Sequence, residues 1–151
     1  MHETRTTFRA AGLSLAGTYT TPKGDGPFPA ALLLNGSGPL DRDGNIKRMP
    51  LNVSRDLATT LADAGWASFR FDKRGIGESE GEYLPTGFYE ERADAEAARD
   101  WLIGRVDVSK VVVIGHSVGA VYAAELAGRE PAVDGAILLA ATAKTGAETL
   151  R

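Results

Sequence analysis

The sequence predicts an α/β fold, a mainly parallel sheet with helices on both faces that is incomplete at its C-terminal end. Two observations lead to this prediction. Short, wholly apolar runs at 30–34 and 111–114 are typical of strands that are covered on both faces. Helical patterns stand between such runs from residue 30 onward, and this alternation favours parallel strands joined by crossover helices. Loops at the carboxyl ends of such strands usually hold the functional site.

Strands are expected in five regions. Residues 4–20 alternate in character and are rich in threonine, which predicts two short antiparallel strands with interruptions at Gly12 and Gly17. The full set of expected regions is 4–20, 30–34, 66–71, 111–114 and 136–141. The last of these would lie at a sheet edge with two apolar faces, so we expect self-association or pairing with another chain.

Three helices are expected between the strands. The first has an apolar stripe and ends near Gly65, and its stripe residues are Val53, Leu57, Leu61 and Ala64. The second covers 89–102, and it has Ala93, Ala97 and Trp101 on one face and Glu90, Asp94 and Arg99 elsewhere. The third is the small-residue stretch 118–127. The first two would each lay one apolar face on the sheet.

The composition is that of an ordinary globular domain. Of 151 residues, 43% are hydrophobic and 25% are charged, which predicts one domain over 1–151. The net charge of -3 is spread along the chain, so we expect a small-molecule partner and neither nucleic acid nor a membrane. The absence of cysteine excludes a disulfide scaffold and thiolate catalysis. The polar N-terminus and the lack of long apolar runs lead us to expect a cytoplasmic protein.

The sharpest motif is Gly115-His116-Ser117-Val118-Gly119, which stands where an apolar strand ends and a small-residue helix begins. Ser117 is the candidate nucleophile, because a tight strand-to-helix turn holds a hydroxyl out of the sheet. The glycines two residues before and two residues after it let the strand and helix backbones approach closely. The same letters without this context would equally fit a flexible loop.

A second loop, Asn35-Gly36-Ser37-Gly38, follows the first apolar strand. Acyl transfer through a serine passes through a tetrahedral oxyanion, which needs two preorganised N–H donors, each worth about 3 kcal/mol. The Val118 amide at the start of the helix would be one donor. The Ser37 amide would be the other, because the glycines on both sides leave its backbone exposed. Without the nucleophile motif, a plain turn would be the better interpretation.

The order of these motifs along the chain resembles a known family. An apolar strand is followed by Asn-Gly-Ser-Gly-Pro from residue 35, Asp-Lys-Arg-Gly-Ile-Gly-Glu-Ser from residue 72 and Gly-His-Ser-Val-Gly from residue 115. This looks like the first half of α/β-hydrolase-fold esterases, close to the bacterial dienelactone-hydrolase-like and serine-aminopeptidase-like groups. The resemblance covers nearly the whole chain. It implies a serine hydrolase that cleaves a carboxylic ester or a related acyl bond without a cofactor or metal.

The resemblance also implies roles for individual residues. The Ser37 and Val118 amides would form the oxyanion hole, and the 72–79 loop would shape the sheet edge and the pocket floor. The residues that support the motifs are Gly36, Gly38, Asp72, Arg74, Gly75, Gly115, His116 and Gly119. A stretch of one bacterial carboxylesterase branch is similar to 36–43, where a substrate role and a solvated polar loop are both open for Asp41, Arg42 and Asp43.

A serine triad needs an imidazole to take the Ser117 proton and a carboxylate to orient that imidazole, and in this fold both follow the nucleophile. The two histidines are His2, near the N-terminus, and His116, whose side chain should turn away from its neighbour and pack or hydrogen-bond locally. After the last expected strand only Glu148 carries a carboxylate. The acid and base are therefore unassigned, and we expect a fragment of an active enzyme that is inactive by itself.

Other functions stay open. A half completed by a second polypeptide and a non-catalytic remnant would both fit the missing triad members, and an acyltransferase or peptidase could use the same serine. A nucleotide-binding module is disfavoured, because Gly36-Ser37-Gly38 lacks the third glycine of the dinucleotide fingerprint and no loop matches a P-loop.

Overall fold

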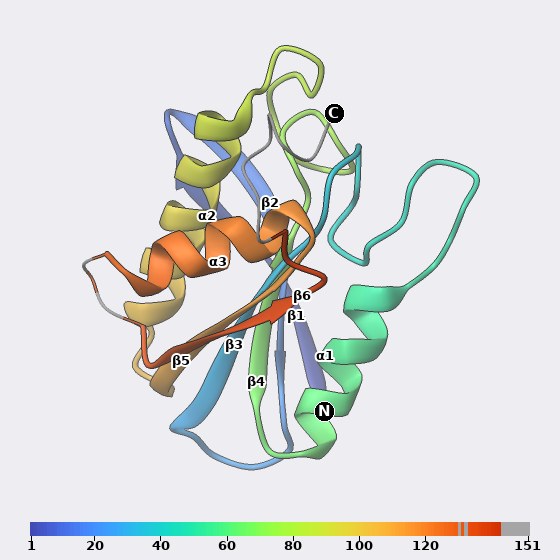
Figure 1. Ribbon diagram of the computed structural model, residues 1–151. Helices are drawn as coiled ribbons and strands as arrows, with labels where there is room; N and C mark the ends of the chain where they lie inside the picture. The colour runs from blue at the N-terminus through green and yellow to red at the C-terminus, as the bar shows by residue number, and fades with distance from the viewer. Residues whose placement is uncertain (130, 132, 143–151) are drawn as a thin grey trace.

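A computed structural model describes residues 1–129, 131 and 133–142. In this part of the chain a six-stranded sheet has the order β1-β2-β4-β3-β5-β6 (Figure 1). The strands are β1 (His2–Ala10), β2 (Leu13–Thr21), β3 (Phe28–Leu34), β4 (Ala67–Phe71), β5 (Val108–His116) and β6 (Gly135–Leu139). β1 and β2 form an antiparallel pair beside β4, and the other four strands run parallel to one another. The predicted mainly parallel sheet is therefore confirmed.

Three helices cover the sheet in the described residues. α1 (Val53–Asp63) lies on one face, while α2 (Phe88–Ile103) and α3 (Val118–Ala127) lie together on the other (Figure 1). The prediction of helices on both faces is confirmed. None of these helices combines the length and the apolar character that crossing a bilayer requires.

The core has two parts because side chains alternate across the sheet. Leu32 of β3 packs with Phe69 and Leu102 in the larger part, on the side of α2 and α3. The neighbouring Leu33 packs with Ala58 in the smaller part, on the side of α1. β3 is therefore apolar on both faces, as its sequence predicts.

From the sequence we expected Gly17 to interrupt a strand, but this prediction is wrong. It lies inside β2, opposite Phe71 of β4. A Cβ atom added there would lie 2.5 Å from the Phe69 ring. The glycine therefore makes room for an aromatic side chain in the core. The interruption between β1 and β2 falls at a turn formed by Ala11 and Gly12, with φ 47 and φ 83.

The helices bury faces that differ from the expected ones. Val53 is 61% exposed, and α1 approaches the sheet through Ser54, Ala58 and Ala62. Small side chains on that face let the helix axis come close to the strands. Leu57 and Leu61 of the expected stripe pack against the core, so the stripe is confirmed in part, while Val53 and Ala64 are exposed.

α2 buries two charged residues that we expected to lie off its core face. Asp94 and Arg99 are both buried. Asp94 pairs with Arg74, while Arg99 pairs with its neighbour Asp100. Periodicity alone did not show these pairs, because their partners lie outside the apolar pattern.

Candidate active site

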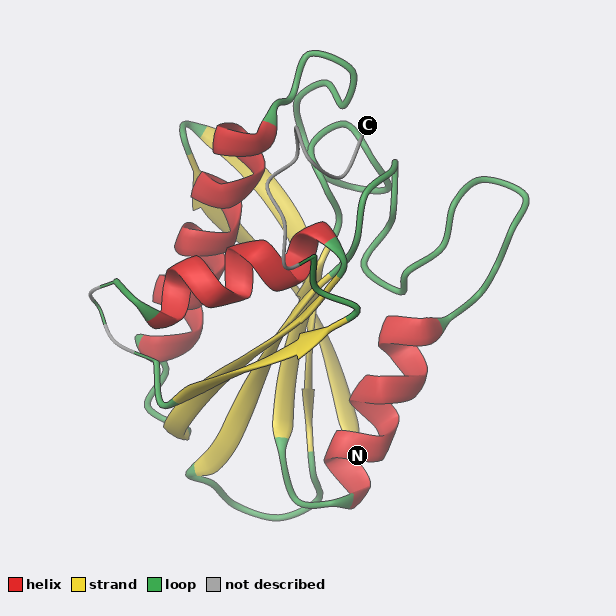
Figure 2. Cartoon of the chain, in the orientation of Figure 1, coloured by secondary structure: helices red, strands yellow, loops and turns green. Residues whose placement is uncertain are grey.

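Three loops meet at the carboxyl ends of the central parallel strands (Figure 2). The 35–52 loop follows β3, the 72–87 loop follows β4, and a tight turn at Ser117 joins β5 to α3. This is the end of the sheet where such folds hold their sites.

The turn at Ser117 has strained backbone geometry. Ser117 precedes the first residue of α3 with φ 55 and ψ −119. A positive φ in a residue other than glycine is uncommon and costs of order 1–3 kcal/mol. The Ser117 N–H donates a hydrogen bond of 2.9 Å to the Leu139 carbonyl oxygen at the end of β6. The last described strand therefore helps to hold the turn.

Close backbone contacts on both sides of the turn require glycine. A Cβ atom at Gly115 would overlap the carbonyl group of Gly119. One at Gly119 would overlap the Leu34 carbonyl oxygen and lie 2.6 Å from the Asn35 carbonyl oxygen. The two glycines thus bring β5, α3 and the end of β3 together, which is the role that their spacing predicts.

The start of the 35–52 loop lies directly against Ser117. A Cβ atom at Gly36 would lie 3.3 Å from the Ser117 Cβ and 3.0 Å from the His116 Nδ1. Ser37 is exposed, and Gly38 follows with φ +106. Val118 is the first residue of α3, so its N–H has no acceptor within that helix. The structure therefore brings the segments that carry both predicted oxyanion donors to the serine.

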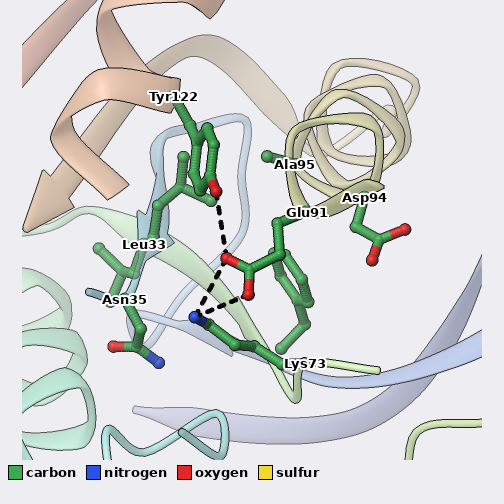
Figure 3. A pocket seen from close by; sticks show the side chains of 9 residues that line it. Leu33, Asn35, Lys73, Glu91, Asp94, Ala95 and Tyr122 are labelled. Carbon is green, nitrogen blue, oxygen red and sulfur yellow. Dashed lines mark hydrogen bonds and ion pairs between the residues drawn. The ribbon is translucent and has the colours of Figure 1, made fainter. Parts of the chain in front are cut away.

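Lys73, at the start of the 72–87 loop, binds the backbone of the 35–52 loop. Its Nζ donates a hydrogen bond of 2.8 Å to the Gly36 carbonyl oxygen. The same Nζ lies 3.1 and 3.2 Å from the two carboxylate oxygens of Glu91 on α2. Tyr122 on α3 donates its hydroxyl to Glu91 at 3.2 Å (Figure 3). These side chains border a cavity of about 30 Å³.

Burial changes the acid–base properties of this cluster. Burial lowers the pKa of Lys73 below its ordinary value, and the nearby Glu91 carboxylate opposes that shift. Burial raises the pKa of Tyr122 far above its ordinary value, and Glu91 adds to the rise. The Tyr122 hydroxyl therefore stays protonated and donates to Glu91 throughout the neutral range.

Asp72 holds the 35–52 loop at a second point. Its carboxylate accepts hydrogen bonds from the backbone N–H and from the Nε of Arg42, at 2.7 and 3.0 Å. A second carboxylate oxygen pairs with Arg42 Nη2 at 2.5 Å and accepts the Glu78 N–H at 3.0 Å. Ionised, bidentate contacts of this kind are among the stronger hydrogen bonds in proteins.

The residues at 41–43 do not form a solvated loop, so that alternative from the sequence is wrong, whereas a substrate role for them stays a prediction. Arg42 is only 9% exposed, and its guanidinium also donates to the Gly17 carbonyl oxygen. Asp43 pairs with the buried Arg70 of β4 at 2.9 Å. Asp41 accepts two backbone N–H groups of its own loop. Arg42 and Asp43 thus join the loop to the β4 region, and all three side chains line a polar cavity.

Arg74 and Gly75 are structural in the same sense. Arg74 forms two hydrogen bonds, at 2.7 and 2.8 Å, with the Asp94 carboxylate of α2. Gly75 has φ +69, and a Cβ atom there would lie 2.7 Å from the Tyr83 backbone nitrogen. The 72–79 segment therefore folds on itself and onto α2.

In the part of the chain that the structure describes, neither His2 nor His116 makes a hydrogen bond to Ser117. His2 lies on the outer strand β1, where it pairs with Thr21 of β2. This is the amino end of the parallel strands, at the opposite end of the sheet from Ser117. His116 is exposed and lines an apolar cavity with Leu33 and Leu57, on the α1 side of the sheet. The expected local packing or hydrogen bonding of His116 stays a prediction. Glu148 lies outside the described residues.

Comparison with known proteins assigns the chain to a family. Residues 51–150 match the family described as serine aminopeptidase, S33. The chain belongs to this S33 family. Its fold and the esterases below place it in the α/β-hydrolase superfamily, in agreement with the resemblance seen in the sequence.

The S33 chain is similar to proteins described as esterases and hydrolases. It is 41% identical over 130 residues to esterase EstD of Thermotoga maritima, covering 86% of this chain and 31% of that protein. It superposes on the α/β hydrolase GrgF of Penicillium sp. sh18 with a TM-score of 0.77 at 21% identity, covering 93% of this chain and 46% of that one. For the Pyrococcus furiosus esterase Pf2001 the TM-score is 0.71 at 22% identity, with coverages of 89% and 49%. The S33 chain thus spans about a third of the Thermotoga esterase and under half of each structure.

Sequence reasoning missed the residues that hold the 35–52 loop. Lys73 stood inside a recognised motif, but its partner Glu91 lies 18 positions further along, and Tyr122, which binds Glu91, lies 49 positions further along on a separate helix. No local pattern links these three. The only signal was that a lysine follows the Asp72 position at the end of a buried strand, where a charge requires a partner.

Proposed function

We propose that this chain carries the nucleophile and the oxyanion hole of a serine hydrolase that cleaves carboxylic esters. The observation that carries the proposal is the strained turn at Ser117, with Gly36 packed against the serine. Membership of a hydrolase family and the similarity to esterase EstD support ester cleavage.

The proposed reaction uses Ser117 as a covalent catalyst. Its Oγ attacks the ester carbonyl carbon and loses its proton, and the carbonyl oxygen becomes an oxyanion that accepts hydrogen bonds from the Val118 and Ser37 N–H groups. The tetrahedral intermediate collapses, the C–O bond to the alcohol breaks, and the alcohol leaves with a proton. Water then attacks the acyl-enzyme, which releases the carboxylic acid and restores the serine hydroxyl.

The proton transfers require a base, and the lack of a hydrogen bond from Ser117 to either His2 or His116 in the described residues supports a base elsewhere. We therefore assign the triad imidazole and carboxylate to the part of the relatives' length that this chain does not span. The 151-residue chain alone should then show ester turnover lower than that of a complete enzyme by roughly 10⁶-fold, the usual cost of losing the base.

Peptidase activity at the same serine is a second candidate, favoured by the family's description as a serine aminopeptidase. The two activities separate on matched substrates. A carboxylesterase hydrolyses a p-nitrophenyl alkanoate and leaves aminoacyl p-nitroanilides intact, whereas an aminopeptidase requires the free amino group and cleaves the anilides.

Fluorophosphonate labelling tests the proposed function. A complete protein that contains this chain should be modified at Ser117, and Ser117→Ala should take up no label. Ser109→Ala is a matched control, because Ser109 is exposed near the opposite end of the same strand, and this variant should label normally. Absence of labelling at Ser117 in the complete protein would contradict the proposal and favour a non-catalytic role for the fold.

A further inference from the structure

The peptide that joins Gly36 to Ser37 has an anchor that the proposed function does not use. Its carbonyl oxygen accepts a hydrogen bond of 2.8 Å from Lys73 Nζ. Glu91 and Tyr122 continue the chain of contacts from two different helices (Figure 3). Lys73 is 9% exposed and Tyr122 is 4% exposed, so the cluster lies mostly out of water.

We infer that Lys73 is a positioning residue that aims the Ser37 N–H at the oxyanion, with Glu91 and Tyr122 holding the lysine in place. The inference rests on the proposed function, because it concerns the oxyanion hole of that reaction. A trans peptide is planar, and its C=O and N–H point in opposite directions. Since Lys73 holds the carbonyl of this peptide, it also fixes the direction of the N–H.

The local sequence makes an external anchor necessary. Gly36 has no Cβ, and one added there would be in tight contact with the His116 ring and the Ser117 side chain. Gly38 adopts φ +106, which side chains disfavour. Glycine on both sides of Ser37 leaves the backbone with little preference of its own. A hydrogen bond from a buried ammonium supplies the missing constraint.

The ammonium also strengthens the donor that it orients. A charged donor on the carbonyl oxygen polarises the peptide, and hydrogen bonds in a chain reinforce one another where the local dielectric constant is low. The Ser37 N–H therefore becomes a better donor to a developing negative charge than an ordinary amide. This effect acts on the transition state more than on the neutral ester.

Lys73 does not serve as the missing base. An ammonium has three donors, and those of Lys73 are directed to the Gly36 carbonyl oxygen and to the two oxygens of Glu91. The other groups around it are Tyr122 on α3 and the Tyr83 ring, whose centroid lies 6.0 Å from Nζ. Asp94 lines the same cavity but pairs with Arg74. The contacts of Lys73 therefore fit a role in orienting the 35–52 loop.

The test compares Lys73→Met with Lys110→Met in a complete enzyme that carries Ser117. Both changes remove one ammonium, but Lys110 is exposed near the start of β5, at the opposite end of the sheet. Active sites are first counted by fluorophosphonate titration, so that loss of folded protein is separated from loss of rate. Lys73→Met should lower kcat per titrated site about tenfold or more with little change in KM, because one oxyanion donor is misdirected. Lys110→Met should leave both parameters unchanged.

The outcomes separate the inference from the proposed function. If wild-type Ser117 takes up no label, the proposed function fails. If Lys73→Met labels fully and keeps its kcat, the positioning role is overturned. A lower number of titrated sites with an unchanged kcat per site, or a rise in KM alone, also overturns it, because Lys73 would then serve folding or ground-state binding.

Glu91→Gln is the second variant, and it keeps a side chain of the same shape. Glu91 raises the pKa of Lys73, so the neutral amide should move loss of the ammonium to lower pH. The alkaline limb of the kcat profile should therefore shift to lower pH than in the wild type, while Lys110→Met keeps the wild-type profile. An unchanged alkaline limb in Glu91→Gln would count against the inference even if Lys73→Met did not fold.

Discussion

The turn between β5 and α3 and the 35–52 loop meet at Ser117, but different forces hold them. The turn depends on backbone contacts so close that only glycine fits at 115 and 119. The loop depends on buried charges. Asp72 binds Arg42 of the loop, and the next residue, Lys73, binds the Gly36 carbonyl oxygen. A contact of the first kind tolerates no added atom, whereas a contact of the second kind fails when one charge loses its partner.

Gly115→Ala should have the largest effect, because the added methyl group overlaps the Gly119 carbonyl group. We expect a loss of more than roughly 4 kcal/mol in the free energy of unfolding, the range that diagnoses a severe local clash. Gly135→Ala in β6 is the matched control, since the nearest atom to its added Cβ is 3.8 Å away. Urea denaturation of both variants measures the difference. Equal stability of the two would show that the turn is less tightly packed than described.

Arg42→Met should come next, because it leaves the Asp72 carboxylate buried without its main partner. Breaking one side of a buried pair costs roughly 3–5 kcal/mol. Arg5→Met removes a guanidinium that pairs with Glu78 while 81% exposed, and such surface pairs contribute under roughly 1 kcal/mol. Urea denaturation gives both values, and limited proteolysis should show faster cleavage of the 35–52 loop in Arg42→Met alone. Similar losses for the two arginines would remove the distinction between buried and surface charge.

A smaller effect should appear in the pH dependence of stability. Burial lowers the pKa of Lys73 in the folded protein below the ordinary value of 10.5. Between these two pKa values the unfolded chain binds more protons than the folded one, so the lysine's contribution to stability rises with pH through this window. The difference in unfolding free energy between the wild type and Lys73→Met should therefore grow in favour of the wild type as pH approaches 10.5. A difference that stays flat, or that falls with pH, would mean that Lys73 is not desolvated.

The smallest effect on folding stability should come from a substitution in β6, the strand that holds the Ser117 turn from the outside. β6 exposes Ile137, Leu138 and Leu139 by 43–49% each, and it is the outer strand of the described sheet. Leu138→Lys should reduce self-association of the 151-residue chain, because a charge on an edge strand opposes pairing with another chain. Leu84→Lys, in a loop where the leucine is 93% exposed, should leave association unchanged. Light scattering over a range of concentrations distinguishes them, and a monodisperse wild-type monomer would contradict the expected association.

The contrast between the two loops also explains what the sequence could predict. The turn is encoded in five consecutive residues, so its position and its glycine contacts follow from a short motif and the flanking strand and helix. The mainly parallel sheet follows from the apolar runs and the helical patterns between them. The role of Gly17 did not, because the Phe69 ring that needs the space comes from a strand 52 positions away.

The charged contacts were harder to predict from the sequence for the same reason. Arg42 looks like a surface residue in a polar loop, and its burial depends on a carboxylate 30 positions further along. Asp94 and Arg99 fall off the apolar pattern of α2 and are buried nonetheless. Periodicity reports where apolar side chains go, whereas the Asp94–Arg74 pair joins positions 20 residues apart that become neighbours only in the folded chain.

The paired anchors at the end of β4 have a consequence for strand alignment. Asp72 and Lys73 directly follow β4, and they bind Arg42 and the Gly36 carbonyl oxygen in the loop that follows β3. Within β4 itself, the buried Arg70 pairs with Asp43 of the same loop. A slip of β4 by one residue would turn Arg70 to the other face of the sheet and move all three charged groups away from their partners. These buried charges therefore fix the register of β4 as well as the position of the 35–52 loop.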